Sequence, residues 1–120
     1  MEANIEEIVN ALIKKTREGN VVWNLSSSKN EFKLQLKDST ICISHMVIRQ
    51  NVFKYTIQIY NANGNVIVNQ SLDGTLATNE LRDLYKAAND SYLKKNETLQ
   101  SILAQVNTEG KIGEDDSLPF

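Results

Sequence analysis

The order of hydrophobic and polar residues along the chain predicts one helix, then several strands, then two further helices. In residues 4–18 an apolar side chain recurs every third or fourth position, the spacing of an amphipathic helix. These apolar positions are Ile5, Ile8, Val9, Leu12 and Ile13. Gly19 follows at the position where a left-handed C-cap ends a helix. We therefore expect the first helix in this stretch.

Between residues 21 and 70 apolar and polar residues alternate, which predicts half-buried β-strands. The alternation covers residues 21–25, 32–36, 41–47, 53–60 and 65–70. Short turns separate these segments, and one of them contains Asn63-Gly64, a pair that favours positive φ in a hairpin. No intervening segment is long enough to connect two parallel strands. The pattern therefore predicts an antiparallel meander of four or five strands.

The helical spacing returns after the Asp73-Gly74 turn. Thr78 or Asn79 can cap a second helix that has Glu80 in its first turn. The apolar stripe of this helix consists of Leu81, Leu84, Tyr85, Ala88 and Tyr92. Asn96 is placed to cap a third helix. The side chains that this helix would bury are Leu99, Ile102, Leu103 and Val106.

These elements predict an α+β fold in which the helices cover one face of an antiparallel sheet. The opposite face can then be exposed to solvent. Residues 1–106 form one predicted domain, and residues 107–120 form a mobile acidic tail, because the periodicity stops at residue 107. The polar side chains assigned to the solvent face are Lys33, Gln35, Lys37, Ser44, Lys54, Thr56, Gln58 and Tyr60.

Composition limits the class of protein. A chain of 120 residues with 41% hydrophobic and 23% charged residues is typical of one globular domain. No apolar stretch is long enough for a membrane span, and the acidic N-terminal residues are unlike a signal peptide. Cys42 is the only cysteine, which fits a reducing compartment. We therefore expect a cytoplasmic protein without a disulfide or a membrane anchor.

Charge is distributed unevenly between the predicted domain and the tail. The net charge is −2, and residues 1–106 carry 12 basic and 11 acidic residues. Residues 107–120 carry one basic and four acidic residues. A nearly neutral domain lacks the strong electrostatic footprint of a dedicated nucleic-acid-binding protein.

The sequence gives little support for an enzyme. His45 is the only histidine, so a metal site with several imidazoles is absent. Cys42 and His45 lie three residues apart in a predicted strand and therefore point to opposite faces, which is wrong for a thiol–imidazole pair. The glycines are isolated and form no phosphate-binding loop. We expect no catalytic residue, no metal and no cofactor.

The solvent face is a candidate surface for single-stranded nucleic acid. Lys33, Lys37 and Lys54 could contact phosphates, and Tyr60 is the aromatic residue expected to point outward. The other aromatic residues of the strands, Trp23, Phe32, Phe53 and Tyr55, fall on the helix-facing side. An ordinary solvated sheet face explains the same pattern, so both interpretations stay open.

The last six residues, 115–120, form an acidic run that ends in Leu-Pro-Phe. The ring of Phe120 can enter an apolar pocket, and its terminal carboxylate can pair with a basic residue at the rim. Pro119 restricts φ and lowers the entropy lost on docking. Asp115 and Asp116 can steer the peptide towards a basic surface, and Leu118 adds an aliphatic contact.

This segment resembles the C-terminal tip of bacterial single-stranded DNA-binding proteins. The resemblance implies a partner from DNA replication or repair that has a basic-rimmed apolar pocket. Ser117 stands where that family usually has another Asp, and the predicted helices do not match the family's five-stranded barrel. We therefore expect a non-enzymatic binding protein of bacterial or phage origin. The alternative is an inhibitor-type or immunity-type domain with an inert, solubilising tail, and either protein could form a homodimer.

Overall fold

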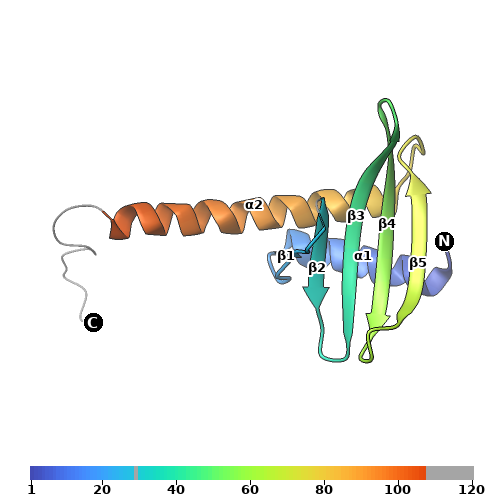
Figure 1. Ribbon diagram of the computed structural model, residues 1–120, viewed down its shortest axis with the longest axis horizontal. Helices are drawn as coiled ribbons and strands as arrows, with labels where there is room; N and C mark the ends of the chain where they lie inside the picture. Colours follow the sequence, from blue (N-terminus) through green and yellow to red (C-terminus); the bar gives the residue numbers. More distant parts are fainter. Residues whose placement is uncertain (29, 108–120) are drawn as a thin grey trace.

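A computed structural model describes residues 1–28 and 30–107 of the chain. The elements are α1 (Ala3–Arg17), β1 (Asn24–Leu25), β2 (Glu31–Gln35), β3 (Ser39–Arg49), β4 (Val52–Asn61), β5 (Val66–Asp73) and α2 (Glu80–Val106). Figure 1 shows the strands side by side in front of both helices, and one helix extends far beyond the sheet. The predicted α+β class is confirmed.

The five strands form one antiparallel sheet in the order β1-β2-β3-β4-β5, so the predicted meander is confirmed. The first strand is shorter than the alternation indicated. The β4–β5 turn is held by the Asn61 side chain, whose Oδ1 accepts hydrogen bonds from the backbone N–H groups of Asn63 and Asn65, both at 3.0 Å. Gly64 supplies the positive φ of this turn, +83°.

The first helix ends as its sequence predicts. Gly19 has a φ of +79°, and its backbone N–H donates to the carbonyl of Thr16. The buried side of α1 and the helix-facing side of the strands meet the first half of α2 in one hydrophobic core. The buried members of this core are Ile5, Val9, Ile13, Trp23, Phe32, Leu34, Ile41, Ile43, Ile57, Ile59, Leu81, Leu84, Tyr85 and Ala88.

A buried polar contact fixes the path from α1 into the sheet. The indole Nε1 of Trp23 donates a hydrogen bond of 3.0 Å to Oγ1 of Thr16. Trp23 is 1% exposed and Thr16 is 4% exposed, so neither group has water as an alternative partner. An indole N–H buried without an acceptor would be costly, and this contact therefore stabilises the α1–β1 connection.

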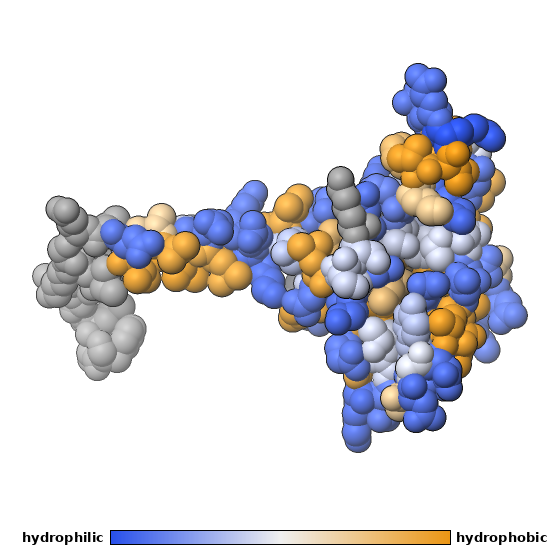
Figure 2. Space-filling model, viewed as in Figure 1, coloured by the Kyte–Doolittle hydropathy of each residue, from blue (hydrophilic) through white to orange (hydrophobic). Residues whose placement is uncertain are grey.

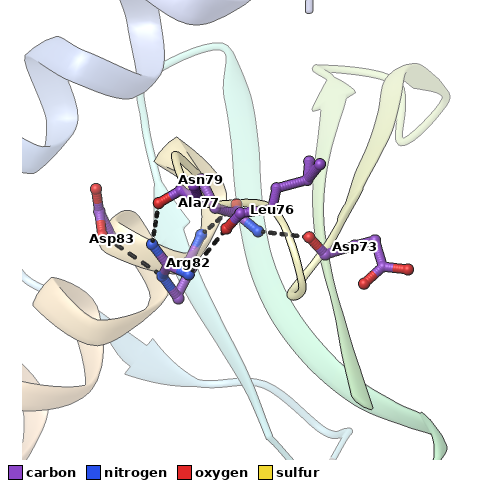
Figure 3. Close-up of polar contacts among 6 residues, drawn as sticks. All are labelled: Asp73, Leu76, Ala77, Asn79, Arg82 and Asp83. Carbon is purple, nitrogen blue, oxygen red and sulfur yellow. Dashed lines mark hydrogen bonds and ion pairs between the residues drawn. The ribbon is translucent and has the colours of Figure 1, made fainter.

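The start of α2 is fixed by Asn79, one of the two predicted caps (Figure 3). Its Oδ1 accepts from the backbone N–H of Arg82 at 2.9 Å, and its Nδ2 donates to the carbonyl of Asp73 at 3.1 Å. Arg82 donates in turn to the carbonyls of Leu76 and Ala77, both at 3.3 Å. Asn79 is completely buried, and it thereby ties the end of β5 to the first turn of α2.

The prediction of two C-terminal helices is wrong, because α2 is one helix of 27 residues. Asn96 lies within it and does not cap a new helix. The neighbouring Thr98 donates from Oγ1 to the carbonyl of Lys94 at 3.0 Å, a contact made inside a continuous helix. No glycine or proline occurs between residues 75 and 107, so the sequence contains no residue that would break α2.

The predicted burial of the second part of α2 is also wrong. Every residue from 93 to 107 is exposed. The four side chains expected in a core are each half exposed: Leu99 53%, Ile102 50%, Leu103 52% and Val106 53%. Figure 2 shows hydrophobic side chains along one side of this part of the helix. We call residues 93–106 the projecting half of α2.

Neither described helix combines the length and the apolar composition needed to cross a bilayer.

Candidate functional site: the open face of the sheet

The face of the sheet opposite the helices is polar, as predicted from the alternation. Antiparallel register aligns the side chains of β2, β3 and β4 in rows across this face. One row contains Lys33, Cys42 and Gln58. The other side chains of these three strands on the same face are Glu31, Gln35, Thr40, Ser44, Met46, Lys54, Thr56 and Tyr60.

Several polar side chains on this face bind one another. The hydroxyl of Tyr60 donates to Oε1 of Gln58 at 3.0 Å, and Thr40 donates to Oε1 of Gln35 at 2.8 Å. Burial is the main cause that raises the pKa of Tyr60, so its phenol stays neutral at physiological pH. The hydrogen bond to Gln58 holds Tyr60 within the polar surface, which is a poor arrangement for a base-stacking platform.

The face is hollowed over β2, β3 and β4, towards the β2–β3 and β4–β5 turns, over a volume of about 690 Å³. Residues 26–28 and the β4–β5 turn contribute to its lining. Figure 2 shows that hydrophilic residues predominate on this side of the sheet. Lys33, Lys37 and Tyr60 line the hollow, so the structure brings three of the four predicted nucleic-acid contacts together. Glu31 and Asp38 line it too, so the charges of the lining cancel.

Lys54 lies apart from the other predicted contacts. Its neighbours across the sheet are Met46 on β3 and Asp73 on β5. Lys54 lies opposite Met46 of β3, whereas Lys33 lies opposite Cys42. These two positions of β3 are four residues apart, a separation of about 13 Å at the usual rise of a strand. The backbone N–H of Thr75 donates to the Asp73 carboxylate at 2.8 Å and lowers its pKa. The carboxylate opposite Lys54 is therefore ionised.

Cys42 lies on the open face and is only 7% exposed. Burial raises the pKa of its thiol, Glu31 raises it further, and Lys33 acts in the opposite direction. The thiol is therefore protonated at neutral pH, whereas a nucleophilic cysteine needs the thiolate. His45 points to the helix-facing side, as the strand spacing predicted. In the described part of the chain, no three metal-ligating side chains of the His, Cys, Asp or Glu type come together.

The contact partners of His45 were not predicted from the sequence. Its ring lies 4.4 Å from the ring of Tyr85 on α2, 5.5 Å from that of Phe53 and 6.0 Å from that of Tyr55, measured between centroids. Burial lowers the pKa of His45. The alternation of side chains that placed Phe53 and Tyr55 on the helix-facing side also places His45 there. Only the tertiary structure brings Tyr85 of α2 next to His45.

The β3–β4 hairpin extends beyond the edge of its neighbours. The pairing of β2 with β3 ends at Ser44, so the following residues of β3 have β4 as their partner strand. Hydrophobic side chains are exposed on this part of the hairpin: Met46 49%, Val47 60%, Ile48 45% and Phe53 38%. Phe53 was assigned to the helix-facing side, but it is not part of the core, because it lies past the cover of the helices.

The predicted partner-binding residues Asp115, Asp116, Leu118, Pro119 and Phe120 lie outside the described residues. Comparison of the chain with protein-family models, with curated proteins and with solved structures finds no match.

Proposed function

We propose that the protein is a non-enzymatic binding protein and that its C-terminal peptide engages a partner of the replication or repair type. In this proposal the ring of Phe120 enters an apolar pocket of the partner, and its terminal carboxylate pairs with a basic residue at the rim. Asp115 and Asp116 steer the peptide towards the basic surface. The thiol of Cys42 and the imidazole of His45 point to opposite faces of the sheet, which disfavours a thiol–imidazole catalytic pair.

One feature of the fold supports the presentation of this peptide. The projecting half of α2 leads the chain away from the sheet (Figure 1). From the half-buried Tyr92 to Val106 the helix rises about 21 Å, at the usual rise per residue. Asn107, the last described residue, therefore lies away from the core of its own copy, which favours access of a partner to the peptide.

The test is a binding measurement with replication and repair proteins that have a basic-rimmed apolar pocket. We expect Phe120→Ala, or deletion of residues 117–120, to abolish binding and leave the thermal unfolding of the domain unchanged. Ser117→Asp adds an acidic residue and should tighten binding at low salt, because it strengthens electrostatic steering. Retention of the same partners by Phe120→Ala would contradict the proposal.

Single-stranded nucleic acid is the secondary ligand that we propose for the open face. Lys33 and Lys37 flank one hollow, whereas Lys54 is paired across the sheet with the acidic Asp73. Lys33→Glu should therefore weaken oligonucleotide binding at low salt more than Lys54→Glu does. Equal effects of the two substitutions, or no binding by the unaltered protein at low salt, would contradict this ligand.

The alternative function is a partner-binding domain of the inhibitor or immunity type with an inert tail. The exposed side chains of the β3–β4 hairpin favour it, because a cluster of exposed apolar residues is typical of interaction sites. In that case Val47→Asp should abolish partner binding, whereas Phe120→Ala should not. The two substitutions therefore distinguish the two functions.

A further inference from the structure

The projecting half of α2 carries an apolar stripe without a partner among the described residues. Leu99, Ile102, Leu103 and Val106 follow one another at spacings of three and four residues, so they lie on one side of the helix. The stripe continues the face that Leu81, Leu84, Tyr85 and Ala88 bury against the sheet, as shown by the same helical spacing.

The sequence of this segment is poorly suited to a solvated helix. Residues 98–107 contain no charged side chain. Isolated helices of this length are marginal in water, and most helical stability in proteins comes from packing of an apolar face. A partner that covers the stripe is therefore needed to stabilise the projecting half.

We propose that this partner is a second copy of the chain, and that the projecting halves of the two copies pack antiparallel. A two-fold axis between Leu99 and Leu103 places the stripes in register with each other. Val106 of one copy then meets a notch of the other copy. The notch is lined by the apolar parts of Leu25, Tyr92 and Leu99 together with the polar residues Asn24, Lys95 and Asn96. Leu25 is 54% exposed, so the interface covers a second exposed apolar residue next to the helix.

Charge favours the antiparallel arrangement over the parallel one. Lys95 lies at the start of the stripe, one turn before Leu99, and its Nζ donates to Oδ1 of Asn24 at 3.4 Å. In an antiparallel pair Lys95 lies beside the C-terminal turn of the other helix, where the backbone carbonyls make the negative end of the dipole. The last turn of α2 has no basic residue of its own. A parallel pair would instead place Lys95 beside Lys95.

The area of the interface sets the expected affinity of the dimer. Four half-exposed aliphatic side chains per copy span about 10 Å of helix, and together with Leu25 they make an interface on the order of 1,000 Å² in total. This area is at the lower limit for specific association. We therefore expect a reversible dimer with a micromolar dissociation constant.

Sedimentation equilibrium of the full chain over a range of concentrations tests the dimer. The average mass should rise from the 13.5 kDa of one copy towards twice that value. Leu99→Glu combined with Leu103→Glu should raise the dissociation constant by at least about 100-fold, because both charges enter the interface. Ser101→Glu combined with Ala104→Glu adds the same charge on the opposite side of the helix and should leave the dimer intact.

The orientation is tested by a distance measurement between spin labels attached at Lys86→Cys, in a Cys42→Ser background. The antiparallel dimer places the two labels roughly 40–50 Å apart, whereas a parallel pair brings them within about 20 Å. A chain that stays monomeric at high concentration, a dimer that survives the Leu99 and Leu103 substitutions, or the short distance would overturn the proposal. Phe120→Ala should not change the dimer, so the tail and the interface are tested separately.

Discussion

The two halves of α2 carry the same kind of apolar stripe in opposite surroundings. In the first half Leu81, Leu84 and Ala88 are completely buried between the sheet and α1. In the projecting half Leu99 and Leu103 are half exposed. The difference shows that the spacing of apolar residues specifies which side of a helix needs cover, whereas the cover itself comes from elsewhere in the fold or from another molecule.

The largest effect on stability is expected when the same truncation is made in each half of α2 and the two losses are compared. Leu84→Ala should lower the free energy of unfolding by about 2–5 kcal/mol, because it removes buried methyl groups and leaves a cavity. Leu103→Ala should change it by less than about 1 kcal/mol when the protein is dilute, because its side chain is half exposed. Urea unfolding at low protein concentration measures both values. Similar losses for the two substitutions would contradict the different surroundings of the two halves.

A smaller effect is expected at the cap of the buried half. Asn79→Ala removes the hydrogen bonds to Arg82 and Asp73 and should lower the free energy of unfolding by about 2 kcal/mol. Thr78→Ala is the matched control, because Thr78 is exposed and should contribute less than about 0.5 kcal/mol. Thermal unfolding followed by circular dichroism distinguishes the two variants. Equal stabilities would show that the cap contributes little.

The smallest effect concerns the contact between His45 on β3 and Tyr85 in the buried half. The pKa of His45 is below its ordinary value of 6.5 in the folded protein, so the unfolded chain binds more protons below neutral pH. The free energy of unfolding should therefore fall as the pH drops through 6.5 towards the lower pKa of the folded state. Above 6.5 the contribution of His45 should not change.

The matched control is His45→Phe, which keeps an aromatic ring beside Tyr55 and Tyr85 without a titrating group. The difference in free energy between the variant and the unaltered protein should depend on pH only below about 6.5. Using the difference removes the contribution of the carboxylates that both proteins share. A difference that stays constant down to pH 5 would contradict the burial of His45 against Tyr85.

Local signals in the sequence predicted much of the sheet and of its connection to α2. The alternation around Ile57 and Ile59 predicted both faces of β4, since successive side chains of a strand point to opposite sides. Asn79 was one of two predicted caps, because a short side chain that accepts from the first turn is favoured there. These features depend on neighbours close in the chain.

The candidate site was predicted less completely. Lys33, Lys37 and Tyr60 were assigned to one face, and the structure places them around one hollow. The separation of Lys54 from them depends on the register between β3 and β4, which the alternation alone does not fix. The charges that oppose the lysines, Glu31 and Asp38, reach the hollow from a strand and from the following turn.

By itself the sequence determined the α+β class, the meander, the polar face of the sheet and the apolar side of α2, since each depends on the local period of hydrophobic residues. Only the tertiary structure decided that α2 continues past Asn96, that Leu99 and Leu103 leave the core, and that His45 meets Tyr85. The reason is physical: periodicity records which side of an element is apolar. The width of the sheet across its strands decides how much of that side of α2 the sheet can cover. The sheet ends before α2 does.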